Sequence, residues 1–218
     1  MKEFLPVLQQ VPLFEGLTGQ ELSGILGCLG ANPMTVRKGM ALFHEGDPAD
    51  FIGIVLEGAV QVLREDYYGN RSILAHIGPQ ELFAESYAFA PGKTLPVSIV
   101  AAEDSRLILL DSSRITACCS NACAFHNQVI FNLLRLVASK NLALHRKIQI
   151  TAQRTTRDKL MTYLLSVAKD QGPSFRIPYD RQGLADYLEV DRSGLSTEIG
   201  KLRKEGILEC DKNNFRLL

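Results

Sequence analysis

The chain has 218 residues, of which 46% are hydrophobic and 22% charged, the composition of an ordinary globular protein with room for two domains. Its 24 basic residues balance its 24 acidic ones, no apolar run approaches the ~20 residues that cross a bilayer, and MKEFLPVLQQ at the start lacks the apolar core of a signal peptide. An odd number of cysteines, five, argues against a disulfide framework, so we expect a cytoplasmic protein with no membrane partner.

Residues 1–116 are predicted to form a β-rich domain behind a short helical lead-in. From Met34 to Asp111, short β-prone runs alternate with glycine-containing turns about every ten residues, a pattern typical of antiparallel sandwiches and barrels. No glycine-rich phosphate loop precedes a helix, which argues against a parallel nucleotide-binding sheet. The clearest predicted strands are Ile52–Leu56, Ala59–Leu63, Ser72–Ile77, Val97–Ala101 and Arg106–Leu110.

Residues 117–150 are predicted to form a long helix that pairs with a second copy of the chain. Neither glycine nor proline interrupts the helical spacing between Ala122 and Ile150. A heptad begun at Leu134 has a single polar member, Asn141, and a lone asparagine at such a position favours a two-stranded pairing in one register. The alternative is a helix packed only on its own domain. The predicted dimer seam consists of Ile130, Leu134, Val137, Asn141, Leu144 and Ile148.

The start of this helix carries a cluster of soft ligands, Cys118, Cys119, Cys123 and His126. The spacing of Cys119, Cys123 and His126 places two thiols and an imidazole on neighbouring turns of one helical face. Thiolates and imidazole bind soft metals and haem, and exposed thiols oxidise, so these residues are a candidate redox or metal site. The alternative is structural, because small buried cysteines are common in packed interiors.

Residues 151–218 are predicted to begin with a hinge and a capped helix. Thr155 and Asp158 have the spacing of a capping box, which starts a helix that runs to about Lys169. The stretch Ile150–Arg154 is therefore the predicted hinge.

Two short amphipathic helices and a hairpin follow. Asp180 and Asp191 each stand immediately before a helical pattern, where a carboxylate accepts hydrogen bonds from unpaired backbone amides. Residues 206–217 read as a hairpin with its turn at Asp211–Asn214. Two tightly joined helices and a hairpin predict a winged helix-turn-helix, whose second helix enters the DNA major groove. Any two amphipathic helices that meet at an angle remain the alternative.

The outer face of the second helix is polar. Arg192 at its start is suited to a guanine or a phosphate, and hydroxyl side chains contact phosphates or base edges. Residues 149–218 hold 12 Lys and Arg against 10 Asp and Glu, so a net charge of +2 gives only weak support for DNA binding. The predicted DNA-binding residues are Arg181, Arg192, Ser193, Ser196, Thr197, Lys201 and Arg203.

Several segments carry a family resemblance. Lys38-Gly39, FHEGDPA (43–49) and IVLEGAVQV (54–62) resemble the jelly-roll effector domain of cyclic-nucleotide-binding proteins, and LFAESYAF (82–89) resembles its phosphate-binding cassette. With the helix-turn-helix downstream, the chain resembles the Crp/Fnr family of bacterial transcription regulators. The resemblance implies an α+β fold of jelly roll, dimerisation helix and winged helix-turn-helix. It also implies a homodimer on a palindromic DNA operator, a small-molecule effector and a possible contact with RNA polymerase.

The sequence departs from the family pattern both in the cassette and in the recognition helix. Glu85 matches the cassette glutamate that holds the ribose, or else it is a structural carboxylate that caps the cassette helix. Leu95 and Pro96 stand where an Arg-Ser pair binds the cyclic phosphate, so we expect no cyclic AMP, and the effector is unknown. The predicted effector pocket consists of Glu85, Ser86, Leu95, Pro96 and Ser98.

In the recognition helix, Ser193 and Thr197 replace the glutamate and arginine that are frequent in the family, so we expect a different operator sequence. Glu189 occupies the turn where glycine is usual, which requires a left-handed or tight backbone there.

Two other functional classes are less well supported. A metalloenzyme on a jelly roll needs clustered histidines, whereas His44 and His76 are far apart and no His-x-His pair occurs. No recognisable catalytic frame is present either, so we do not expect an enzyme. The remaining alternative is an effector-binding or protein-interaction module whose C-terminal helices contact protein instead of DNA.

Overall fold

The computed structural model describes residues 4–117 and 124–218. Its internal contacts divide the chain into two compact units. Unit 1 contains Met1–Arg64 and Leu74–Asn141, and unit 2 contains Glu65–Ile73 and Leu142–Leu218. Within the described residues, no helix is both long and apolar enough to cross a bilayer.

Unit 1 begins with short helices that cover one face of the β-domain. They are α1 (Leu5–Leu8), the 3-10 helix η2 (Pro12–Phe14) and α2 (Gly19–Cys28). A capping box starts α2, because the Thr18 amide donates to Glu21 Oε2 at 2.7 Å while the Glu21 amide donates to Thr18 Oγ1 at 3.4 Å.

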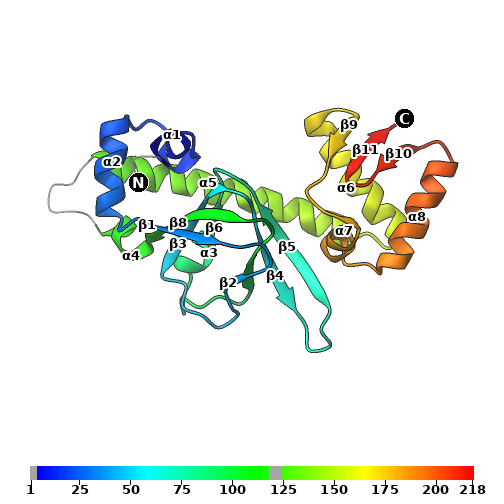
Figure 1. The fold of residues 1–218 in the computed structure, drawn as a ribbon, viewed down its shortest axis with the longest axis horizontal. Helices are drawn as coiled ribbons and strands as arrows, with labels where there is room; N and C mark the ends of the chain where they lie inside the picture. Colours follow the sequence, from blue (N-terminus) through cyan, green and yellow to red (C-terminus); the bar gives the residue numbers. More distant parts are fainter. Residues whose placement is uncertain (1–3, 118–123) are drawn as a thin grey trace. The chain divides into compact units, whose positions relative to one another are not determined.

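Eight strands of the chain form two four-stranded sheets, ordered β1-β8-β3-β6 and β2-β7-β4-β5 (Figure 1). The pairs β1–β8, β8–β3 and β3–β6 of the first sheet, and β2–β7 and β7–β4 of the second, are antiparallel. The strands are β1 (Asn32–Val36), β2 (Ala41–Phe43), β3 (Phe51–Glu57), β4 (Val60–Glu65), β5 (Arg71–Ile77), β6 (Leu82–Phe83), β7 (Ser98–Ala101) and β8 (Ser105–Asp111).

The central strand β3 is buried on both faces, and its alternating side chains join two separate cores. Ile52 and Ile54 pack with the N-terminal helices. Val55 packs with Val60 and other residues of the second sheet. Because successive strand residues point to opposite faces, this division shows one sheet placed between helices on one side and a second sheet on the other.

Two glycines, Gly53 in β3 and Gly58 in the turn after it, lie where neighbouring atoms leave no room for a Cβ. A Cβ on Gly53 would lie 1.9 Å from Cζ of Phe83, the ring that fills the space over the strand. Gly58 turns the chain from β3 into β4 with φ of 77°, and a Cβ there would lie 2.3 Å from the Asp104 carbonyl oxygen. A side chain at either position would displace its neighbours.

The β-domain leads through α4 (Ser112–Thr116) to the long helix α5 (Ala124–Thr151). The inner face of α5 in unit 1 packs against the N-terminal helices through Val129 and Leu133. The Asn132 side-chain amide adds hydrogen bonds to the carbonyl oxygens of Leu13 at 3.0 Å and Glu15 at 2.9 Å. One face of α5 in unit 1 thus packs against its own chain.

Unit 2 is a helical domain with a three-stranded sheet of order β10-β11-β9 (Figure 1). Buried aliphatic and aromatic side chains from its helices and strands, including Leu164, Leu195 and Phe215, form one core. The elements are α6 (Thr156–Gln171), β9 (Ser174–Arg176), α7 (Arg181–Leu188), α8 (Arg192–Lys204), β10 (Leu208–Asp211) and β11 (Asn214–Leu217).

The α+β prediction of jelly roll, long helix and winged helix-turn-helix is confirmed. Each of the five predicted strands overlaps an observed one. Four strands, β1, β2, β6 and β9, were not predicted. They are short or carry mostly exposed side chains, and therefore lack an alternating apolar pattern.

Candidate DNA-binding surface and cassette site

The two helices of the helix-turn-helix start on aspartate caps. Asp180 Oδ1 accepts from the Gly183 amide at 2.7 Å, and Asp191 Oδ1 accepts from the Gly194 amide at 2.8 Å. The hydrogen bonds from Ser193 and Gly194 hold the pKa of the Asp191 carboxyl below its ordinary value. Both caps lie where the sequence places them.

The turn between the helices has the predicted left-handed residue. Glu189 ends α7 with φ of 54° and ψ of 56°, and its carbonyl oxygen accepts from Lys159 Nζ at 3.2 Å. This bond satisfies one carbonyl at the end of α7 and ties the turn to α6. The backbone strain of a non-glycine residue there is therefore offset by a contact from outside the motif.

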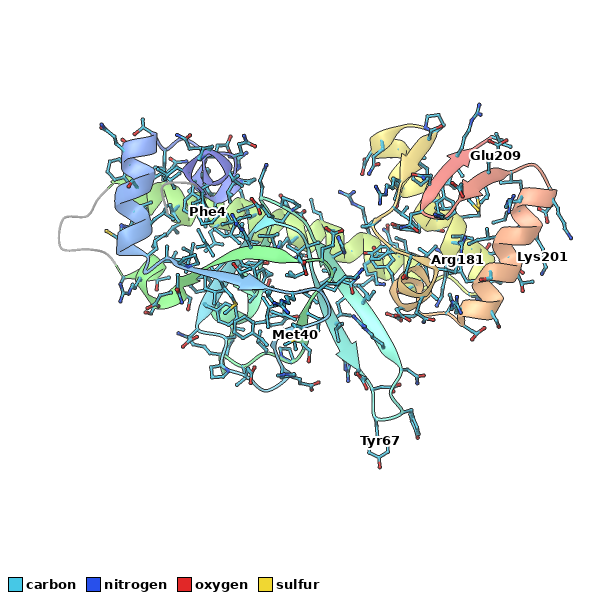
Figure 2. The ribbon with its side chains drawn as sticks, in the orientation of Figure 1. Phe4, Met40, Tyr67, Arg181, Lys201 and Glu209 are labelled. Atoms are coloured by element: carbon cyan, nitrogen blue, oxygen red, sulfur yellow. The ribbon has the colours of Figure 1, made fainter. Side chains whose placement is uncertain are left out.

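Helix α8 has one buried and one exposed face. Leu195, Ile199 and Leu202 are buried in the core of unit 2, whereas Arg192 is exposed. The other predicted contact residues on this helix are also exposed: Ser193, Ser196, Thr197, Lys201 and Arg203. The apolar spacing fixes the orientation of the helix, and the polar side chains project from the opposite face (Lys201 in Figure 2).

The hydroxyl side chains of this face are held by their own helix. Ser196 Oγ donates to the Arg192 carbonyl oxygen at 2.9 Å, and Thr197 Oγ1 donates to the Ser193 carbonyl oxygen at 3.0 Å. Ser193 Oγ donates to Asp191. Each exposed oxygen keeps lone pairs for an incoming donor, and each hydroxyl can turn toward a phosphate at the cost of one local bond.

The basic residues around the motif differ in their contacts. Lys201 pairs with Glu198 at 2.6 Å on the surface of α8. Arg203, with Arg176 and Arg216, lines a shallow hollow beside the wing strands. The Arg181 guanidinium lies 6.0 Å from the centre of the Phe215 ring. The guanidinium of Arg181, a predicted DNA-binding residue, therefore lies over the Phe215 ring of the wing strand β11.

The predicted seam residues of α5 lie on its outer face. Four apolar side chains are substantially exposed: Ile130 (38%), Leu134 (66%), Leu144 (56%) and Ile148 (54%). Asn141 is exposed and Val137 is half-buried. Phe131 and Leu142, which the sequence analysis did not select, are exposed to 57% and 60%. Apolar exposure on this scale is unusual for a helix surface in water.

The cassette places Glu85 at the start of α3 (Glu85–Ala88), immediately after Ala84 in the left-handed region with φ of 66°. The carboxylate is buried, and Ser86 Oγ lies 3.4 Å from Glu85 Oε1. Among the described residues Glu85 Oε2 has no hydrogen-bond partner, and Oε1 accepts from the Ser86 hydroxyl.

The remaining predicted pocket residues lie on the neighbouring strand and loop. The Leu95 side chain is buried in the core between the sheets, and its backbone pairs with Gly46 and Asp47. Ser98 Oγ accepts from the Glu45 amide at 3.2 Å, and Pro96 is exposed. Leucine at this place contributes packing and offers no side-chain donor for a phosphate.

Glu85 is neutralised by a residue that no sequence pattern singled out. Lys140 of α5 lies with its Nζ 2.9 Å from Glu85 Oε1, and it also donates to the Leu82 carbonyl oxygen. The signal was present in the helical spacing, because Lys140 continues the buried stripe that runs through Val129 and Leu133. A charged residue at such a position calls for an internal partner.

A second lysine of α5 is buried within unit 2. Lys147 lies with Nζ 3.7 Å from the centre of the Tyr187 ring of α7, and within the described residues it has no hydrogen-bond partner. Burial is the main cause that lowers its pKa to about 8, with a smaller contribution from Lys159 and an opposing one from Glu189.

Most of the candidate redox or metal cluster lies outside the part of the chain that the structure describes. Cys118, Cys119 and Cys123 lie outside the described residues, and His126 is buried. Among the described residues, no group of three or more His, Cys, Asp and Glu side chains is arranged to hold a metal ion.

Comparison with known proteins agrees with this architecture. The family model of the cyclic nucleotide-binding domain matches residues 33–122, and that of the Crp-like helix-turn-helix domain matches residues 158–218. The chain is 26% identical over 198 residues to the cyclic AMP receptor protein of Thermus thermophilus, covering 90% of this chain and 88% of the relative. It is 21% identical over 207 residues to a CRP-like cAMP-activated global transcriptional regulator of Mycobacterium tuberculosis, covering 94% and 91%.

Solved structures show the same fold. FixK2 of Bradyrhizobium japonicum superposes with a TM-score of 0.69 at 22% identity, covering 86% of this chain and 92% of its own. The c-di-GMP responsive regulator CLP of Xanthomonas campestris superposes with a TM-score of 0.73 at 18% identity, covering 89% and 98%.

The fold and the sequence matches define a DNA-binding transcription regulator that carries a cyclic-nucleotide-binding domain. The chain belongs to the Crp/Fnr family. This family consists of regulators and not of enzymes, as the absence of a catalytic frame in the sequence predicted.

Proposed function

We propose that this regulator acts as a homodimer that binds a palindromic DNA site and responds to a signal other than cyclic AMP. The observation that carries the proposal is the apolar seam on the outer face of α5. Leu134 alone is 66% exposed, and the seam residues recur at heptad spacing along the helix. Burial against a second copy removes this surface from water, at roughly 25 cal/mol for each Å² of apolar area.

Asn141 supports a two-stranded pairing of that seam. It is exposed in the single chain and stands among apolar seam positions. In a dimer, two Asn141 side chains meet and hydrogen-bond only in one register, which disfavours slipped pairings. A symmetric dimer carries two copies of α8, and two copies related by a twofold axis read two inverted half-sites.

The signal is proposed to differ from cyclic AMP because the cassette lacks a cation for the phosphate. Leu95 stands where the family has its phosphate-binding arginine, and its side chain is buried in the core. Lys140, which reaches the cassette, already forms an ion pair with Glu85. A cyclic phosphate would lose its water without gaining a charge-assisted partner.

The dimer is tested by placing a charge in the seam. Leu134→Glu sets two carboxylates near each other across the proposed interface, and we expect sedimentation to show a monomer. The matched control is Leu165→Glu on α6, where the leucine is similarly exposed at 56% and lies outside the seam. The control is expected to sediment as the wild type does. A dimeric Leu134→Glu protein would contradict the proposed seam.

The DNA site is tested by selection from a random library with the wild-type dimer. We expect the recovered sites to contain inverted half-sites, whose centres lie about one helical turn apart. Fluorescence anisotropy should show that Leu134→Glu binds the selected site at least 100-fold more weakly, because one half-site contact must then act alone. Recovery of sites without inverted symmetry would contradict the proposal.

Calorimetry tests the effector. We expect no heat of cyclic AMP binding to the wild-type dimer at millimolar nucleotide. Leu95→Arg with Pro96→Ser restores the side chains of the family pattern and serves as the gain-of-function comparison. A micromolar dissociation constant for the wild type would exclude our interpretation of the cassette.

A further inference from the structure

Both ends of α8 are held by the first turn of α6, and all the residues involved belong to unit 2. Arg157, the second residue of α6, donates to Glu205, the residue that follows α8, with Nη1 3.0 Å from Oε1 and Nη2 2.5 Å from Oε2. Lys159 Nζ donates at 3.2 Å to the carbonyl oxygen of Glu189, in the turn before α8. The start of α6 therefore contacts the chain on both sides of the recognition helix.

Neither charge of the Arg157–Glu205 pair suits the helix end on which it stands. A helix is positive at its start and negative at its end, because its backbone dipoles are aligned. Arg157 is a cation at the start of α6, and Glu205 is an anion at the end of α8. Each charge is unfavourable for its own helix, and the pairing offsets both. The contact between the two helices therefore accounts for these residue types at these positions.

The geometry of this pair is that of an orienting contact. Its two parallel hydrogen bonds fix the direction of the guanidinium and the carboxylate as well as their distance. Hydrogen bonding from Arg157 is the main cause that holds the pKa of the Glu205 carboxyl below its ordinary value. By contrast, Arg146 of α5 reaches Asp170 of α6 through Nη1 and Oδ2 at 3.4 Å, with side chains 60% and 63% exposed. Arg157 and Glu205 are less exposed, at 37% and 43%.

The core contacts of α8 are apolar, whereas the contacts at its ends are directional. Leu195, Ile199 and Leu202 of α8 lie in one core with Leu160 and Leu164 of α6. Hydrophobic burial has no preferred direction, but a hydrogen bond weakens steeply when its alignment is lost. The 13 residues of α8 span about 20 Å, so a small tilt about the capped start moves the far end most. The polar contacts at the two ends therefore oppose such a tilt.

We propose that Arg157 is a positioning residue for sequence-specific DNA binding. Through Glu205 it fixes the far end of α8, while Asp191 and the bond from Lys159 hold the start. The side chains on the outer face of α8 then meet successive base pairs in one orientation, and Arg157 itself needs no contact with DNA. This inference rests on the proposed reading of a DNA site by α8 and extends it to a residue outside that helix.

The test removes both charges of the pair together. Arg157→Met/Glu205→Gln leaves the net charge unchanged, so the attraction to phosphates that governs non-specific binding is kept. We expect its dissociation constant for the site that the wild type selects to rise about tenfold, the loss of roughly one good base contact. For a random duplex of the same length the constant should stay within about twofold of the wild type. The thermal midpoint should change by no more than about two degrees, because partly exposed ion pairs contribute little to stability.

Two further variants separate positioning from other effects of charge. The exchange Arg157→Glu/Glu205→Arg restores a pair and gives each helix end the charge that its dipole favours, so we expect it to bind the selected site within about threefold of the wild type. Arg146→Met/Asp170→Asn removes an exposed pair of unit 2 that does not involve α8, and both dissociation constants should stay unchanged. Fluorescence anisotropy compares all four proteins on the same two duplexes over a range of salt concentrations.

The outcomes distinguish this inference from the proposed function. If the wild type selects no DNA sequence, the proposed function fails, and the positioning role fails with it. If the wild type selects a site and Arg157→Met/Glu205→Gln discriminates as well as the wild type, only the positioning role fails. Equal weakening on both duplexes, with a smaller salt dependence, would assign Arg157 to a phosphate contact and overturn the positioning role. A charge exchange that restores no discrimination would overturn it as well, because the pair would then not orient α8.

Discussion

The outer face of α8 and the cassette end of the β-domain use polar side chains in opposite ways. On α8, Arg192 and Ser196 are exposed, and the Ser196 hydroxyl bonds to a carbonyl oxygen of its own helix. In the cassette, Glu85 is buried and its charge is neutralised by Lys140 from within the chain. The polar groups on α8 are accessible to a partner, whereas those in the cassette pair with other groups of the chain. Substitutions should therefore change binding on α8 and stability in the cassette.

The largest expected effect comes from breaking the cassette pair on one side only. Lys140→Met leaves Glu85 buried without a cation, and we expect a loss of about 2–3 kcal/mol in the free energy of unfolding, somewhat below the usual cost because Lys140 is partly exposed. Lys201→Met breaks the surface pair with Glu198 on α8 and should cost less than about 1 kcal/mol. Urea denaturation of both variants measures the difference. Equal losses of unfolding free energy in the two variants would contradict the expected difference between the buried and the exposed ion pair.

The two regions also differ in how far the sequence predicted them. The caps at Asp180 and Asp191 and the left-handed Glu189 depend on residues within three or four positions, so local patterns were sufficient. The partner of Glu85 comes from a helix far along the chain, and no local rule connects the two. Similarly, β9 has only three residues, and its pairing with β11 exists only after the helices have brought them together.

The lack of an arginine at position 95 could be read from the sequence, but the structural environment of the leucine there could not. The family resemblance identifies Leu95 as the residue that stands where an arginine is expected. Only the fold shows that Leu95 joins the core between the sheets and that Lys140 pairs with the remaining carboxylate. Burial and long-range charge pairing follow from the tertiary arrangement of strands and helices, which a single sequence does not specify residue by residue.

Lys147 extends the comparison to a buried charge without an acidic partner at contact distance. Its folded-state pKa of about 8 lies below the ordinary value of about 10.4, so the folded protein binds fewer protons than the unfolded chain between these pH values. The penalty of the buried charge is complete below pH 8, and stability rises as the pH increases from about 8 to 10. We expect a gain on the order of 2 kcal/mol over this range.

The measurement compares wild type with Lys147→Met by urea denaturation at several pH values. The variant lacks the titrating amine, so its stability should follow a flatter pH profile, and Lys169→Met on the exposed end of α6 should retain the profile of the wild type. The contact with the Tyr187 ring favours the charged amine and limits the size of the effect. Parallel profiles for all three proteins would show that Lys147 does not titrate in this range.

Arg192→Ala tests the open surface of α8. We expect the preference for one base pair in each half-site to fall about tenfold, because a bidentate arginine contact contributes roughly 1–3 kcal/mol of discrimination. Binding-site selection measures the preference, and the urea midpoint should stay unchanged. Lys201→Met is the matched control, expected to weaken binding equally for all sequences and to reduce its salt dependence. An unchanged base preference would remove Arg192 from the set of base-reading residues.

The smallest expected effect concerns the cap that holds Arg192 at the first turn of α8. Asp191→Ala removes the acceptor of the Gly194 amide and should lower the thermal midpoint by a few degrees. Asp191→Asn keeps a capping oxygen without the charge and should lose less. Because hydrogen bonds depress the folded-state pKa of Asp191, the advantage of aspartate over asparagine is present above its ordinary pKa of about 3.9.

That advantage should disappear as the pH falls through the lower folded-state value, where the carboxylate becomes protonated. Thermal melts of the wild type and the Asn variant between pH 7 and pH 3 measure the convergence. The same pair of proteins reports on function, because a frayed first turn moves Arg192. If Asp191→Ala loses base preference together with thermal stability while Asp191→Asn keeps both, the cap positions the reading side chain. If base preference is unchanged in Asp191→Ala, Arg192 is placed by the DNA and not by the helix start.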